Sequence, residues 1–143
     1  MLLSNRDVMD PKDAALLNPL QLAYVGDAVW EILVRQQLIL KCFNVHHMHT
    51  ECVRRVNAAA QAGYMALLRP CLNDVEMEIA RRGRNAHARH PSPRNQAPED
   101  YAESTSFEAV IGYLYLTGQK NRLAELYGLL SGAGGENVSK APE

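Results

Sequence analysis

The chain has 143 residues, of which 47% are hydrophobic and 22% are charged, and its formal net charge is −1. The length fits one domain, and the balanced charge excludes a globally basic protein, so binding to a polyanion must rest on local charge patterning. Acidic residues interrupt the longest apolar runs, which excludes a membrane-spanning helix. The three cysteines form no CxxC motif, and their odd number is typical of a reduced, cytoplasmic protein.

Helical periodicity and helix caps recur along the chain, and no stretch alternates between apolar and polar residues as a half-buried strand does. The sequence therefore predicts an all-α domain, folded as a helical bundle. The expected helices cover residues 11–17, 20–40, 45–68, 74–82, 104–116 and 120–130. The end of the chain is rich in Gly and Ser, so we expect one folded domain over residues 1–130 and a disordered tail over residues 131–143.

The helix expected from residue 20 onward is the most apolar part of the chain. Asn18 followed by Pro19 is typical of a helix start. Over residues 20–34 the helix is apolar on almost every side, which predicts a buried, central helix. Asp27 lies in the middle of it, and because burying an unpaired charge costs several kcal/mol, we expect it to be paired, protonated or bound to a metal ion. Gly26 lowers helix propensity by about 1 kcal/mol, which indicates close packing at this position.

A second apolar helix repeats this pattern. Ser104 is its expected N-cap, and Gly118 is expected to end it. Glu108 is its only charged residue, and Gly112 lies one turn away on the same face. Either acid alone could be a structural group with a buried hydrogen bond. Two such acids on two apolar helices favour a shared divalent cation, because carboxylate oxygens from facing helices suit Mg²⁺ or Mn²⁺.

Two segments carry a resemblance to a known family. Residues 22–28 (LAYVGDA) are similar to the signature helix of the ribonuclease III family, and residues 107–112 (FEAVIG) are similar to its second catalytic helix. The chain resembles the short bacterial members, which consist of the catalytic domain alone. The resemblance implies a Mg²⁺-dependent endoribonuclease, with Mn²⁺ as a possible substitute, that cleaves double-stranded RNA and leaves 5′-phosphate ends.

The same resemblance implies residue roles and partners. Asp27 and Glu108 are the implied catalytic residues and metal ligands. The family's homodimer implies an interface that contains Tyr24, and we expect Ala28, one turn further along the same helix, to lie there too. The implied substrate is a precursor of large-subunit (23S) ribosomal RNA, and a ribosomal protein is a further candidate partner.

The chain departs from the larger members of the family at two positions. Those enzymes carry additional acids one turn before the aspartate and three residues before the glutamate, where this chain has Ala23 and Thr105. The number of metal ions, one or two, is therefore open. Glu31 could act as an outer ligand through water, or serve packing alone.

A basic segment between the two helices is the best candidate for RNA contact. Residues 81–95 contain five arginines and two histidines and no acidic residue, and the arginine fork matches phosphate oxygens. A solvated loop is the alternative. Residues 82–86 (RGRNA) resemble a segment of the short bacterial members of the family, and this resemblance implies Arg82, Arg84 and Asn85. The predicted RNA-binding residues are Arg81, Arg82, Arg84, Asn85 and Arg89.

Three alternatives stay open at this point. An all-α nucleotide pyrophosphohydrolase also uses carboxylates in a helical bundle, but its dense Glu-x-x-Glu arrays are missing from both apolar helices. A non-catalytic module for double-stranded RNA would need the arginines but not the two acids. His46, His47 and His49 suggest zinc only weakly, because no second pair of ligands accompanies them at zinc spacing.

Overall fold

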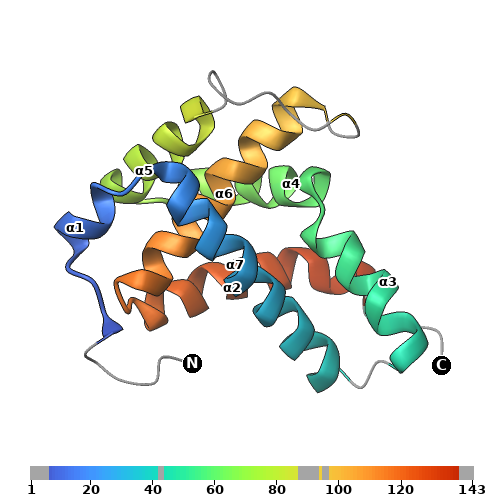
Figure 1. The fold of residues 1–143 in the computed structure, drawn as a ribbon. Helices are drawn as coiled ribbons and strands as arrows, with labels where there is room; N and C mark the ends of the chain where they lie inside the picture. Colours follow the sequence, from blue (N-terminus) through green and yellow to red (C-terminus); the bar gives the residue numbers. More distant parts are fainter. Residues whose placement is uncertain (1–6, 42–43, 87–93, 95–96, 139–143) are drawn as a thin grey trace.

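The computed structural model describes residues 7–41, 44–86, 94 and 97–138, with side chains described as far as residue 131. These residues form helices joined by short turns and contain no strand, which confirms the all-α prediction (Figure 1). The elements are α1 (Pro11–Ala15), α2 (Pro19–Leu40), α3 (Val45–Val56), α4 (Ala58–Leu68), the 3-10 turn η2 (Arg69–Cys71), α5 (Asp74–Asn85), α6 (Pro98–Leu116) and α7 (Lys120–Val138).

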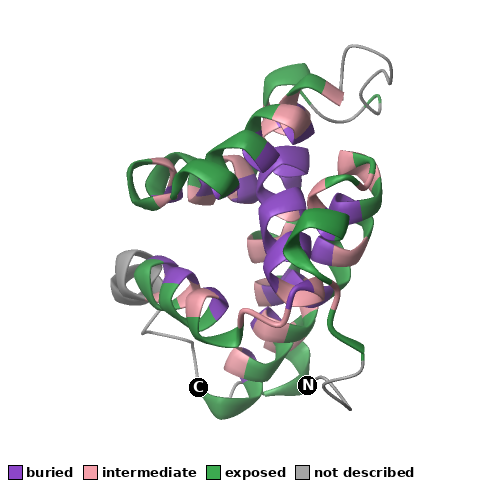
Figure 2. Ribbon diagram, turned by 90° about the vertical axis from the view of Figure 1, so that its left-hand side faces the viewer, coloured by how far each residue is buried: buried purple, intermediate pink, exposed green. Residues whose placement is uncertain are grey.

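Helix α6 is the centre of the fold, and α1, α2, α4, α5 and α7 all pack against it. Figure 2 shows the buried residues concentrated along one helix that runs through the middle of the molecule. From Ser104 to Leu114, every residue of α6 is buried except Glu108. The core therefore forms around α6.

Helix α2 begins as predicted but is less buried than predicted. The Asn18 side chain accepts a hydrogen bond from the Leu20 amide at 2.9 Å, and Pro19 occupies the first turn. Tyr24 is 83% exposed and Ile32 is 49% exposed, so the expectation of a helix buried on nearly all sides is wrong. A helix that is apolar on all sides can be fully buried, or it can leave one apolar stripe exposed, and the sequence pattern is the same in both cases.

Helices α2 and α6 cross at two glycines. A Cβ atom on Gly26 would lie 1.7 Å from the carbonyl oxygen of Glu108, and one on Gly112 would lie 1.9 Å from the carbonyl oxygen of Leu22. Real Cβ contacts are never this short. The two backbones are therefore in direct contact, and only glycine, which has no Cβ, fits at these positions. The close packing predicted for these glycines is confirmed, and it fixes the two helices relative to each other.

Several helix boundaries differ from the sequence prediction, including the ends of α1 at Ala15 and of α5 at Asn85, which were expected at residues 17 and 82. The helix expected over residues 45–68 is divided at Asn57, whose extended backbone and side chain cap α4 by accepting the Ala60 amide at 2.8 Å. Helix α6 begins at Pro98, so Ser104 lies inside the helix instead of capping it. Helix α7 continues to Val138, past the expected end at residue 130. The domain boundary at residue 130 stays a prediction, and residues 139–143 lie outside the described part of the chain.

A buried ion pair connects α7 to the start of α5. Glu76 is 1% exposed, and both of its carboxylate oxygens accept hydrogen bonds from Arg122, at 2.8 and 3.0 Å. The same arginine donates to the carbonyl oxygen of Cys71 at 2.6 Å. Burial alone would raise the pKa of Glu76, but the hydrogen bonds from Arg122 and Asn73 outweigh it and the pKa is lowered.

Among the helices described, none is long and apolar enough to cross a membrane.

Candidate active site

The crossing of α2 and α6 brings Asp27 and Glu108 into one site. Asp27 directly follows Gly26, and Gly26 packs on the backbone of Glu108 itself. The side chain of Asp27 is exposed, whereas that of Glu108 is half-buried. The negative charge of Asp27 acts on Glu108 and contributes to raising its pKa. Two acids that lie far apart in the sequence therefore share one electrostatic environment at the surface.

The electrostatics of this pair suit a cation. Burial raises the pKa of Glu108 to about 7, with a further contribution from Asp27 and an opposing one from a hydrogen bond donated by Ser104. Asp27 is exposed but still partly desolvated by its neighbours, and this desolvation, together with the charge of Glu31, raises its pKa. Both acids are thus harder to ionise than usual when no cation is bound. A divalent cation between them favours the charged forms, and two carboxylates are the oxygen donors that Mg²⁺ and Mn²⁺ accept.

The neighbouring positions add no further ligand. Ala23 is buried and has no donor atom, and Thr105 is buried with its hydroxyl donated to the carbonyl oxygen of Tyr101 at 2.9 Å. Glu31 accepts a hydrogen bond from Arg35 at 2.5 Å, one turn further along α2. Among the described residues, no three His, Cys, Asp or Glu side chains gather as a metal-binding group. Any ion here would take its remaining ligands from water and from phosphate oxygens.

Sequence reasoning missed two residues of this site, Ser104 and Gln61. The Ser104 hydroxyl lies 2.9 Å from a carboxylate oxygen of Glu108 and 2.5 Å from the amide oxygen of Gln61 on α4. The spacing of four residues between Ser104 and Glu108 was a usable signal, because such residues are neighbours on a helix. Because Ser104 was expected to cap the helix, its side chain was not expected to contact Glu108, one turn later.

The basic segment is only partly described. Arg81 pairs with Glu78 on the surface of α5, and its side chain is 60% exposed. Arg82 donates hydrogen bonds to the carbonyl oxygens of Ala15 and Leu17, at the end of α1. Arg82 therefore has a structural role that the sequence prediction did not include. Arg89 lies outside the described residues.

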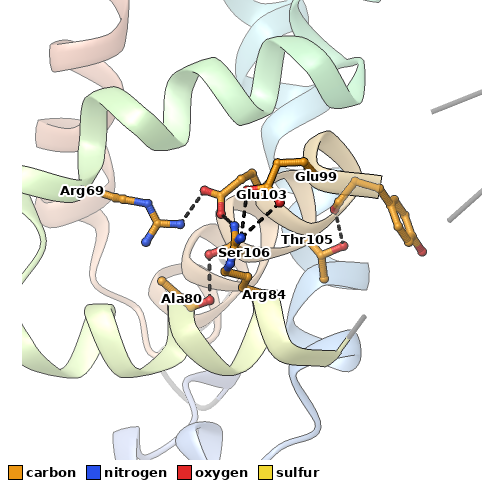
Figure 3. A network of polar contacts seen from close by, with 8 residues as sticks. Arg69, Ala80, Arg84, Glu99, Glu103, Thr105 and Ser106 are labelled. Atoms are coloured by element: carbon orange, nitrogen blue, oxygen red, sulfur yellow. Dashed lines mark hydrogen bonds and ion pairs between the residues drawn. The ribbon is translucent and has the colours of Figure 1, made fainter. Parts of the chain in front are cut away.

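Arg84 is also held within the chain. Figure 3 shows it beside Glu99 and Glu103 of α6, with Arg69 on the other side of Glu103. The Arg84 to Glu99 distance is 2.8 Å, and the Glu103 side chain is 13% exposed. Each of these charges already has an opposite charge next to it. Arg84 is consequently less available to RNA than the sequence suggested.

Asn85 lies at a surface pocket near the start of α2. The pocket has a volume of about 400 Å³. Its lining residues are Asn18, Pro19, Leu20, Arg81, Arg82, Asn85 and Ala86. Three of the predicted RNA-binding residues, Arg81, Arg82 and Asn85, thus line the same pocket.

The other predicted residues are placed as follows. Tyr24 and Ala28 lie on the exposed stripe of α2, in line with Ile32. His47 forms a hydrogen bond with the side chain of Asn44 at 2.7 Å, and within the described chain the histidines of α3 build no metal-binding group. The zinc alternative therefore gains no support.

Comparison with known proteins shows the family to which the chain belongs. Residues 20–119 match the Ribonuclease III domain, a span that contains both acids and both glycines of the helix crossing. The chain belongs to the ribonuclease III family and is an endoribonuclease of double-stranded RNA that leaves 5′-phosphate ends. This assignment removes the pyrophosphohydrolase and the non-catalytic module from consideration.

Similar relatives narrow the assignment to a subfamily. A Mini-ribonuclease 3 of Symbiobacterium thermophilum is 46% identical over 111 residues, which cover 77% of this chain and 85% of the relative. A Mini-ribonuclease 3 of Brevibacillus brevis is 42% identical over 116 residues, which cover 80% and 86%. A crystal structure of a Fusobacterium nucleatum protein has the same fold, with a TM-score of 0.76 and 25% identity, and covers 85% of this chain and 97% of its own.

Proposed function

We propose that this endoribonuclease binds Mg²⁺ between Asp27 and Glu108 and acts in the cytoplasm as a homodimer on a precursor of 23S ribosomal RNA. One observation supports the metal site: Gly26 packs on the backbone of Glu108, and the charge of the adjacent Asp27 acts on the Glu108 carboxyl group. The Mini-ribonuclease 3 relatives support the same reading. A ribosomal-protein partner stays a prediction.

The residues present fit a magnesium ion. Asp27 and Glu108 offer two carboxylate groups, and Mg²⁺ commonly binds one or two carboxylates while water and phosphate oxygens complete its shell. When bound, the ion lowers the pKa of a coordinated water and stabilises the charge that develops on the phosphate. Asp27 is exposed and so lies on the side from which RNA can approach, whereas Glu108 is recessed and fixed by Ser104.

The direct test compares one RNA as a duplex and as its two separated strands. We expect cleavage of the duplex with Mg²⁺ or Mn²⁺ and none after chelation by EDTA, because nothing then lowers the pKa of the attacking water or stabilises the charge that develops on the phosphate. The measurement is gel analysis of end-labelled strands, and ligation checks that the products carry 5′ phosphates. Full cleavage in EDTA, or equal cleavage of the single strands, contradicts the proposal.

The homodimer is proposed to form through the exposed stripe of α2. Tyr24, Ala28 and Ile32 follow one another at helical spacing, and a tyrosine that is 83% exposed is a large apolar surface to leave in water. Two sites in one dimer would face the two strands of a duplex.

Tyr24→Arg is expected to give monomers, because a charge in the interface is desolvated without a partner. Sedimentation should measure twice the 15.9 kDa chain mass for the unchanged protein and 15.9 kDa for the variant. Leu67→Arg is the control, since Leu67 is 53% exposed on α4, away from the stripe. A monomeric unchanged protein at micromolar concentration rules the dimer out.

Of the three arginines at the end of α5, Arg81 is the one that is most available to RNA. Its only described pair is with Glu78 at the surface, and such pairs contribute little to stability. Arg81→Ala should weaken RNA binding and reduce the salt dependence by up to about one unit of log–log slope, because one phosphate contact is lost.

Arg54→Ala is the matched control. Arg54 forms the same kind of surface pair, with Glu51 three residues earlier, and its side chain is 71% exposed. Binding titrations at several salt concentrations compare the two variants. Equal affinity and equal slope for both would move the RNA-binding face away from the pocket at the start of α2.

A further inference from the structure

A buried polar chain leads from the interior of the fold to Glu108. Gln61 on α4 is 1% exposed, and Ser104 on α6 is 4% exposed. The Ser104 hydroxyl contacts both the Gln61 amide, at 2.5 Å, and the Glu108 carboxylate, at 2.9 Å. Neither the metal chemistry nor the packing of apolar side chains requires a glutamine in this part of the core.

The hydrogen atoms of this chain can be assigned from the polar atoms present. A serine hydroxyl has one proton, so it cannot donate to Gln61 and to Glu108 fully at the same time. The Gln61 nitrogen Nε2 is buried and has no hydrogen-bond partner. Exchanging the amide oxygen and nitrogen of Gln61, which a half-turn of the group achieves, gives the nitrogen a partner in Ser104 and leaves the oxygen at the unpaired position. Gln61 then donates to Ser104, and Ser104 donates to Glu108.

We propose that Gln61 is a positioning residue, which acts through Ser104 to hold the Glu108 carboxylate in the orientation that shares a metal ion with Asp27. The proposal rests on the metal role proposed for Glu108. Two carboxylates are a small set of ligands, so the direction of each one has a large effect on the affinity for a cation. Groups that orient a metal ligand typically change metal affinity by 10- to 100-fold when removed.

The rival role for Gln61 is purely structural, a polar contact that connects α4 to α6. A structural contact affects the stability of the fold and leaves the metal affinity of the folded protein unchanged. Metal affinity measured without RNA therefore separates the two roles. Electron paramagnetic resonance of free Mn²⁺ during a titration measures that affinity directly and does not depend on cleavage.

The test uses Gln61→Met, which keeps the length of the side chain and removes its hydrogen bonds, and Ser104→Ala. Both should weaken Mn²⁺ binding by about tenfold or more, and Ser104→Thr should restore most of the loss because it keeps the hydroxyl. RNA affinity in EDTA should be unchanged in all three. The Mg²⁺ concentration for half-maximal cleavage should rise in parallel with the Mn²⁺ dissociation constant.

Ser106→Ala is the matched control. The Ser106 hydroxyl is equally buried on the same helix, but it donates to the carbonyl oxygen of Ala80 on α5 at 2.7 Å. This variant should lose stability and keep its Mn²⁺ affinity. If Gln61→Met proves unstable, the comparison of Ser104→Ala with Ser104→Thr decides the question.

Glu108→Gln separates the failure of this inference from that of the proposed function. Unchanged Mn²⁺ affinity in Glu108→Gln overturns the metal site itself. Loss of affinity in Glu108→Gln, with unchanged affinity in Gln61→Met and Ser104→Ala, overturns the positioning role alone.

Discussion

Replacing Asp27 by asparagine should lower the cleavage of duplex RNA by about a thousandfold or more and leave the protein folded. The substitution keeps the shape of the side chain and removes the anionic ligand. A metal ion contributes several kcal/mol to the stabilisation of the transition state, and each 1.36 kcal/mol corresponds to a factor of ten in rate. Single-turnover cleavage at saturating Mg²⁺ measures the loss.

The thermal stability of Asp27→Asn is an internal control. The pKa of Asp27 is raised in the folded protein, so at neutral pH its ionised form is disfavoured by folding. Removing the charge should therefore leave the melting temperature unchanged or raise it slightly. Glu31→Gln, on the same helix, should retain most of the activity because Arg35 holds that carboxylate. Cleavage by Asp27→Asn at the unchanged rate would falsify the metal assignment.

Gly26→Ala is expected to have the largest effect on stability. The new Cβ would lie 1.7 Å from the carbonyl oxygen of Glu108, and the neighbour in contact is backbone, which cannot rotate away. Helices α2 and α6 must separate, at a cost at or above the upper end of the roughly 1–3 kcal/mol of overpacked cores. We expect the melting temperature to fall by about 10 °C or more. Cleavage should fall as well, because the separation moves Asp27 away from Glu108.

Gly63→Ala is the matched substitution. Gly63 also lies inside a helix, α4, but apart from its chain neighbours and the backbone of its own helix a Cβ there would meet no atom within 4 Å. This change should stabilise the protein by about 0.5–1 kcal/mol, because alanine favours the helix. Calorimetry of both variants gives a comparison in which only the surroundings of the new methyl group differ. Equal melting temperatures would mean that the two helices are not in close contact.

Local signals predicted that Asp27 and Glu108 lie close to each other. Glu108 is the only charge over residues 104–116, Asp27 is one of two over residues 20–34, and each lies near a glycine without a local reason, so these features can be recognised without knowledge of the tertiary structure. The structure supplies the shared reason, since the backbones meet at Gly26 and Gly112. The start of α2 was predicted for the same kind of reason, because Asn18 and Pro19 act on adjacent residues.

Long-range partners explain what the sequence did not show. Arg82 donates hydrogen bonds to carbonyl groups at and just after the end of α1, which precede it by more than sixty positions in the chain, and no local pattern indicates such a contact. Gln61 is buried because α4 packs on α6, and no local pattern distinguishes it from an exposed polar residue of a surface helix. The helical periodicity continues through Asn57. Only the extended backbone of this residue shows that α3 and α4 are separate helices.

The ion pairs of Arg84 have a consequence for how this enzyme can vary. They join the end of α5 to the first turns of α6, so both ends of the connection between these helices are fixed by charge. The entropy of closing such a connection rises only with the logarithm of its length, by about 0.6 kcal/mol for each doubling. Residues can therefore be inserted or exchanged between Asn85 and Pro98 at little cost, while the helix crossing beneath keeps its geometry. We expect changes in this connection to leave the contact of Gly26 with Glu108, and with it the position of the two acids, as it is.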